Sequence, residues 1–128
     1  MKKYPVYELK NTLPMDATAF AQKWIQSWNS HDLDDIMSHY SDDLEVTTPM
    51  IRIATGLETD TLKGKQAARE YWRKGLERFP DLKFELLDVT AGVDSVALYY
   101  KSVMDKRSVE VMFFNAEGLV CKMFAHYT

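Results

Sequence analysis

Two charged residues stand out in the last third of the chain because their neighbours along two predicted strands are apolar. Lys101 ends the run Ser95-Val96-Ala97-Leu98-Tyr99-Tyr100, and Glu110 lies among Val109, Val111 and Met112. If the two- or four-residue connection common in hairpins joins these strands, their alternation places Lys101 and Glu110 on one face. A desolvated carboxyl beside an ammonium can act as acid, base or anchor for a polar ligand group, and the alternative is a structural ion pair. Glu110 and Lys101 are therefore the candidate catalytic residues.

Large side chains that could line a pocket for a small hydrophobic molecule recur on the predicted helices and strands. The helical ones lie on apolar stripes, so each of them lines a cavity or simply packs in a helix core. Thr48 is added because it lies beside the end of a strand. The candidate ligand-binding residues are Trp24, Trp28, Tyr40, Thr48, Tyr71, Trp72, Phe79, Tyr99, Met112, Met123 and Tyr127.

The other residue types that carry proton or metal chemistry are less promising. His31 lies in a predicted turn, His39 lies on the polar side of its helix, and strand alternation places His126 opposite Glu110 unless a bulge intervenes. The adjacent Asp42–Asp43 point in different directions and suit a turn between a helix and a strand. Cys121 is the only cysteine. We therefore expect no metal site, no disulfide within the chain and no cofactor.

Three helices are expected to position these residues. Apolar residues recur at helical spacing from Asp16 to Trp28, from about Leu33 to Tyr40, and from about Lys65 to Arg78. Between the last two helices a short strand begins at Leu44. Residues 50–64 follow it and show no regular spacing of apolar residues. We expect the latter to be a loop or irregular hairpin that acts as a mobile cover over the cavity mouth.

The remainder of the chain predicts four strands that form antiparallel hairpins, at about 82–89, 95–104, 108–115 and 119–127. With three helices in the N-terminal half, this order predicts an α+β fold in which helices pack on a mainly antiparallel sheet. The length suits a single domain, at 15–128, preceded by an N-terminal arm, at 1–14.

Both faces of the predicted sheet are apolar. One face carries Glu110 with its candidate pocket residues. The predicted helices do not cover the other face, and its side chains are mostly apolar. A second copy of the chain is the usual cover for such a face. We therefore expect a homodimer whose interface includes Leu98, Tyr100, Val111, Phe113 and Phe124.

Composition excludes two classes of partner. The net charge of −3 and the pI near 5.6 come without the clustered lysines and arginines that neutralise phosphates, so no nucleic acid is expected. No segment approaches the roughly 20 apolar residues that span a bilayer, and the first ten residues lack the apolar run of a signal peptide. The expectation is a cytoplasmic protein that does not associate with membranes.

Several segments together resemble the nuclear transport factor 2-like superfamily, and within it the SnoaL-like group of polyketide cyclases and ketosteroid isomerases. They are Trp28-Asn29-Ser30-His31-Asp32-Leu33-Asp34, Tyr40-Ser41-Asp42-Asp43, Leu62-Lys63-Gly64-Lys65, Phe79-Pro80-Asp81-Leu82 and Ala125-His126-Tyr127. The resemblance covers about residues 16–127. It implies a cone of helices packed into a strongly bent sheet, a deep apolar cavity, and dimers formed through the sheet.

The resemblance transfers only one of three catalytic positions of the ketosteroid isomerases. Thr48 takes the place of their aspartate base and Trp24 that of their oxyanion-binding tyrosine, whereas Glu110 falls near their protonated acid. The Asp-Arg-Asp set of the related epoxide hydrolases is not apparent. We expect a SnoaL-like protein with a small-molecule pocket, an isomerase, cyclase or dehydratase that acts on a hydrophobic carbonyl compound. The alternative is a non-catalytic ligand-binding or dimeric interaction module of the same fold.

Overall fold

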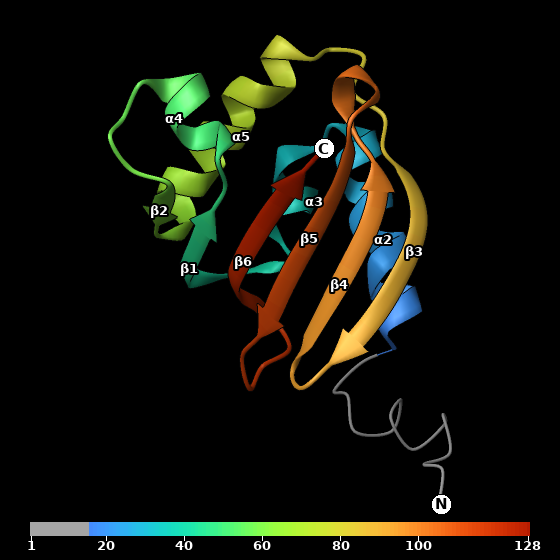
Figure 1. Cartoon of the computed structure of the whole chain (residues 1–128). Helices are drawn as coiled ribbons and strands as arrows, with labels where there is room; N and C mark the ends of the chain where they lie inside the picture. Colours follow the sequence, from blue (N-terminus) through green and yellow to red (C-terminus); the bar gives the residue numbers. More distant parts are fainter. Residues whose placement is uncertain (1–15) are drawn as a thin grey trace, which may run out of the picture.

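The computed structural model describes residues 16–128, so the predicted arm at 1–14 lies outside the described residues. Within that range the chain forms four α-helices and one six-stranded sheet (Figure 1). The helices are α2 (Ala17–Ser30), α3 (Leu33–Met37), α4 (Met50–Thr55) and α5 (Lys65–Arg78). The predicted α+β fold is confirmed.

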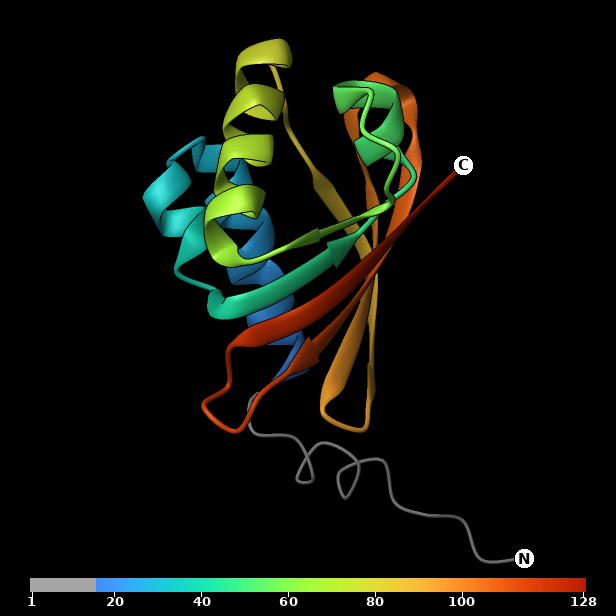
Figure 2. The ribbon, with the colours of Figure 1, turned by 90° about the vertical axis from the view of Figure 1, so that its left-hand side faces the viewer.

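The sheet has the strand order β2-β1-β6-β5-β4-β3. Its strands are β1 (Tyr40–Thr47), β2 (Thr61–Lys63), β3 (Glu85–Gly92), β4 (Ser95–Lys101), β5 (Arg107–Phe114) and β6 (Val120–Tyr127). Only β1 and β6 pair in parallel, and the sheet remains open between β2 and β3. Helices α2, α3 and α5 lie on one side of the bent sheet (Figure 2), so one sheet face and the helices enclose the interior.

Local capping explains where the first two helices begin and end. The carboxylate of Asp16 accepts hydrogen bonds from the first free N–H groups of α2, and Asp32 does the same for α3. His31 ends α2 in the left-handed conformation, at φ 61°. Its Nε2 lies 2.7 Å from the carbonyl oxygen of Leu82. The prediction that His31 is a turn residue is confirmed.

The prediction of an irregular segment at residues 50–64 is wrong. Helix α4 follows Pro49 and ends at Gly56, whose φ of 73° suits glycine, and β2 then pairs with β1. Arg52 and Asp60 close the intervening turn with an ion pair of 2.8 Å. The sequence does not reveal these two elements because α4 and β2 are each too short for a regular spacing of apolar residues to repeat.

The connection from β4 to β5 decides which side chains face the interior. Lys101 pairs with Arg107, so the connection is Ser102–Lys106, an odd number of residues. Met104 and Asp105 both have a φ of 56°, which lets this odd connection close. An odd connection reverses the alternation that an even hairpin gives. The expectation that Lys101 shares the face of Glu110 is therefore wrong.

The same reversal moves three other predicted residues. Leu98 and Tyr100, expected in a dimer interface, are 0% and 2% exposed and lie in the core beside Glu110. Tyr99 lies on the outer face with Lys101, where its hydroxyl accepts a hydrogen bond of 3.1 Å from Arg107. A shift in the pairing between β5 and β6 occurs at Cys121, which is half-buried.

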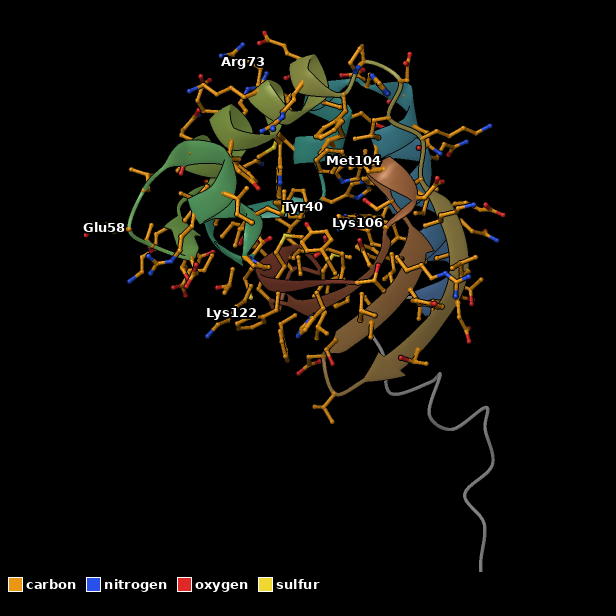
Figure 3. All side chains as sticks on the ribbon, turned by 45° about the horizontal axis from the view of Figure 1, so that its top comes forward. Tyr40, Glu58, Arg73, Met104, Lys106 and Lys122 are labelled. Carbon is orange, nitrogen blue, oxygen red and sulfur yellow. The ribbon has the colours of Figure 1, made fainter. Side chains whose placement is uncertain are left out.

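The interior is an aromatic core between the helices and the sheet. Trp24 Nε1 donates a 2.8 Å hydrogen bond to the hydroxyl of Tyr40, and the indole stacks on Phe84. Asn29 binds both the N–H and the carbonyl of Phe84, at 2.7 and 2.9 Å, and so ties α2 to the segment before β3. Figure 3 shows Tyr40 inside the molecule, whereas the charged side chains of Glu58 and Arg73 point outward.

Candidate functional site

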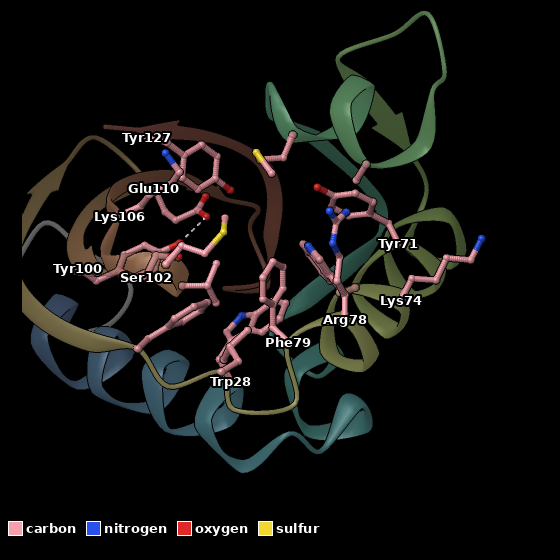
Figure 4. Close-up of a pocket in the computed structure, with 18 of the residues that line it drawn as sticks. Trp28, Tyr71, Lys74, Arg78, Phe79, Tyr100, Ser102, Lys106, Glu110 and Tyr127 are labelled. Atoms are coloured by element: carbon pink, nitrogen blue, oxygen red, sulfur yellow. Dashed lines mark hydrogen bonds between the residues drawn. The ribbon is translucent and has the colours of Figure 1, made fainter.

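A cavity of about 220 Å³ opens between α5, α4 and the β4–β5 connection (Figure 4). Its walls are mostly apolar and aromatic. Trp24 and Trp28 of α2 contribute to one wall, and Tyr71, Trp72 and Phe79, in or just after α5, contribute to another. A concave, largely apolar space with few polar groups is typical of small-molecule sites.

Among residues 16–128, Glu110 is the one acidic residue that lines this cavity. Strand β5 places it opposite Leu98 and Ala125, and its side chain is 5% exposed. Its Oε1 accepts a hydrogen bond of 3.0 Å from the hydroxyl of Tyr100, drawn in Figure 4, and its Oε2 has no hydrogen-bond partner in the part of the chain that the structure describes. A buried carboxyl with one free oxygen is poised to bind or protonate a ligand.

Burial determines the protonation state of Glu110. Removal from water disfavours the carboxylate and raises the pKa from 4.5 to about 8, although the Tyr100 hydrogen bond opposes the shift. At neutral pH the carboxyl is therefore mostly protonated. Its free Oε2 is then a hydrogen-bond donor in an apolar cavity.

Three tyrosines line the cavity together with this carboxyl. Burial is the main cause that raises the pKa of Tyr71, Tyr100 and Tyr127, and the charge on Glu110 raises each further. All three hydroxyls thus stay protonated over the whole range in which Glu110 titrates. In Figure 4, Tyr100 and Tyr127 lie close to Glu110, and Tyr71 lies across the cavity on α5.

The cavity brings together most of the predicted ligand-binding residues. Those that line it are Trp24, Trp28, Tyr71, Trp72, Phe79, Met123 and Tyr127. Tyr40 and Met112 are instead fully buried in the core. Thr48 is buried too, and its hydroxyl accepts a hydrogen bond of 3.2 Å from the N–H of Met50 at the start of α4.

Lys101 does not take part in this site. It is exposed on the outer face of the sheet, and other cations border the cavity instead. Arg78 and Lys74 come from α5, and Lys106 comes from the β4–β5 connection. Sequence reasoning missed Arg78, although it lies seven residues after Tyr71 on the same helix face, and it missed Tyr100 because the hairpin was assumed to be even.

His39 does not lie where it was expected. The prediction of an exposed helix position is wrong, because α3 ends at Met37 and the imidazole is half-buried against Phe20. Its Nε2 lies 2.8 Å from the hydroxyl of Ser27, and burial lowers its pKa while the charge on Asp35 opposes the shift. His39 lies outside the cavity lining, and His126 is exposed on the outer sheet face as predicted.

Residues 16–128 contain neither a metal-binding cluster nor a membrane-spanning helix. In that part of the chain no three or more His, Cys, Asp or Glu side chains come together to hold a metal ion. None of the helices described there has the length and apolar character needed to cross a membrane.

Comparison with known proteins identifies the family. The model of the SnoaL-like domain matches residues 21–123, so the chain belongs to the SnoaL-like family. A SnoaL-like protein of unknown function from Burkholderia thailandensis is 42% identical, with a TM-score of 0.84, and the match covers 87% of this chain and 92% of that one. No protein with a curated description matches this chain.

More distant solved structures share the fold. A putative hydroxylase from Streptomyces galilaeus is 22% identical, with a TM-score of 0.66, and 87% of each chain is covered. A putative ketosteroid isomerase from Kribbella flavida is 18% identical, with a TM-score of 0.62, and the match covers 86% of this chain and 76% of that one. At these identities the likeness concerns the fold, on which several chemistries occur.

Proposed function

We propose that this protein binds a small hydrophobic carbonyl compound in the cavity and catalyses its isomerisation without a cofactor. The observation that carries the proposal is Glu110, a buried carboxyl in an aromatic-lined cavity whose Oε2 has no hydrogen-bond partner among residues 16–128. An unsatisfied buried polar atom is costly, so its retention suggests that a ligand completes it. The isomerase described for one fold neighbour is consistent with this chemistry.

Glu110 would act as the general acid. When the ligand's carbonyl oxygen approaches Oε2, the carboxyl proton transfers to that oxygen while water removes a proton from the adjacent carbon and becomes a hydronium ion. In a ketone whose double bond lies one carbon further on, the product is a dienol. The dienol takes up the proton from the hydronium ion at the far end of its diene, and its hydroxyl returns the other proton to Glu110, so the double bond has moved and both groups are restored. Tyr100 holds Oε1 and so fixes the direction in which the carboxyl presents its proton.

The pKa of about 8 suits this task. A carboxyl with the ordinary pKa of a glutamate would be ionised at neutral pH and could not donate a proton. The apolar walls around Glu110 keep the acid form populated. The alternative of a non-catalytic binding module needs the same cavity but no such titrating group.

The test measures by NMR, in heavy water, how fast deuterium replaces the hydrogens on the carbon next to a ketone carbonyl. Tetralone and indanone are suitable probes because each is a small apolar ring system with one carbonyl. We expect the wild-type protein to accelerate exchange and the Glu110→Gln variant to lose most of this acceleration, about a hundredfold, the usual contribution of a general acid.

Two controls give the result its meaning. Glu85→Gln removes an exposed carboxylate from β3 and should leave exchange unchanged. The wild-type rate should fall as the pH rises through about 8, because the protonated form of Glu110 disappears. Probes that bind wild type and Glu110→Gln equally, with no exchange in either, would refute catalysis and establish the binding module.

A further inference from the structure

The charged groups that border the cavity are unequally distributed. Glu110, inside, is mostly protonated at neutral pH, and the other charged residues of the lining are the cations Lys74, Arg78 and Lys106. The cavity is therefore nearly neutral within and positive at its mouth, although the whole chain has a net charge of −3. Local charge of this kind favours ligands with a negative end.

Arg78 is the cation best placed to bind such an end. The other arginines of residues 16–128 all have a side-chain partner, whereas Arg78 has neither an ion pair nor a side-chain hydrogen bond. Its guanidinium carbon lies 5.8 Å from the centre of the Phe79 ring, a contact that holds it beside the cavity wall. Its donors are thus available and positioned.

The two lysines are less suited to this role. In Figure 4 the side chain of Lys74 points away from the cavity, whereas that of Arg78 extends toward Tyr71. Lys106 already donates a hydrogen bond of 3.2 Å from Nζ to the carbonyl oxygen of Thr128. One specific anion contact is therefore expected at the mouth, on Arg78.

We infer that the ligand is a small oxo acid, with its carbonyl at Glu110, its apolar body in the cavity and its carboxylate on Arg78. A guanidinium forms paired hydrogen bonds with a carboxylate, so the contact also orients the ligand. This inference rests on the proposed function, since it assumes that Glu110 receives the carbonyl. It adds the ligand's second polar group and the residue that selects it.

Two features narrow the ligand further. The cavity of about 220 Å³ is smaller than the roughly 300–1,000 Å³ of sites for drug-sized molecules, so the buried body has one or two rings. Asp81 and Asp105 border an adjoining groove together with Arg78. They form no ion pair with it, and they repel a doubly charged group about twice as strongly as a singly charged one, which favours a monocarboxylate over a phosphate.

Naphthaleneacetic acid and naphthaleneacetamide test the inference, because they share one apolar body and differ in charge. Their affinities can be measured by quenching of tryptophan fluorescence, since Trp24 and Trp28 line the cavity. We expect wild type to bind the acid about fivefold more tightly than the amide, the upper range for an exposed ion pair. Arg78→Gln should remove this preference, so that acid and amide bind with similar affinity.

Lys74→Gln is the matched control, because it removes the same charge from the same helix. It should retain most of the preference for the acid, and Arg78→Lys should retain only part, since a lysine lacks the planar fork. Equal affinity of wild type for acid and amide, absence of binding of both, or equal effects of Lys74→Gln and Arg78→Gln would overturn the inference.

The exchange assay separates this inference from the proposed function. Tetralone has no carboxylate, so its exchange in wild type and Glu110→Gln tests the proposed function independently of the anion contact. Exchange that depends on Glu110 without any preference for the acid would overturn the anion contact alone. A preference that depends on Arg78 without exchange in any ketone would overturn catalysis, and with it the oxo-acid assignment, and leave a binding site for carboxylates.

Discussion

Replacement of Glu110 by glutamine should stabilise the folded protein at neutral pH. The carboxyl has a pKa of about 8 in the fold and the ordinary value of 4.5 when exposed. Between these values the unfolded chain releases a proton that the folded chain keeps, so stability is complete below 4.5 and falls as the pH rises toward 8. A carboxylate in a salt bridge has the opposite effect, because it makes the folded protein more stable as the pH rises.

The magnitude follows from the two pKa values. Each pH unit between them is worth about 1.4 kcal/mol, so Glu110 destabilises the fold by about 3 kcal/mol at neutral pH and about 5 kcal/mol above pH 8. Glutamine keeps the shape and offers an N–H donor where the protonated carboxyl has its O–H, but it does not titrate. That difference is a large fraction of the stability of a small domain.

The assay is urea unfolding of wild type and Glu110→Gln across the pH range. The two proteins should be equally stable near pH 4.5, and the variant should exceed wild type by about 3 kcal/mol at neutral pH. Glu85→Gln, which alters an exposed carboxylate of β3, should follow the wild-type profile. Parallel profiles for wild type and Glu110→Gln would show that Glu110 is ionised in the fold, and the acid role proposed for it would fall.

Three other predictions follow from the structure. His39 is half-buried with a lowered pKa, so the free energy of unfolding should fall as the pH drops below about 6.5. Urea unfolding should show a smaller fall in His39→Gln. We propose that the outer sheet face forms a homodimer, so light scattering should give the mass of a dimer for wild type and a lower mass for Phe113→Glu. Leu57→Glu, which changes an exposed apolar residue elsewhere, should keep the dimer mass. A monomer mass for wild type would refute this proposal. Asn29→Ala should cost about 2–3 kcal/mol because the backbone N–H and carbonyl of Phe84 lose their partner, and an unchanged urea midpoint would contradict this.

The sequence alone determined the elements that carry strong periodic patterns. Helix α5 has the predicted limits, Lys65–Arg78, because an apolar face repeats over its whole length and Pro80 follows it. The alternation of β5 likewise placed Glu110 on an apolar face. These are local properties, since each depends on residues within one element and on the fixed geometry of a helix or strand.

Only the tertiary structure decided which side chains meet Glu110. Both faces of β4 are apolar enough to be buried, so its pattern does not distinguish Lys101 from Tyr100 as the neighbour of Glu110. The choice depends on the connection Ser102–Lys106, which has an odd length and contains two left-handed residues that are not glycine. The spacing between Tyr71 and Arg78 puts both on one face of α5, but the position of Arg78 at the cavity mouth depends on how α5 packs across the sheet. Alternation along a strand is local, but the choice of face is set by pairing between strands.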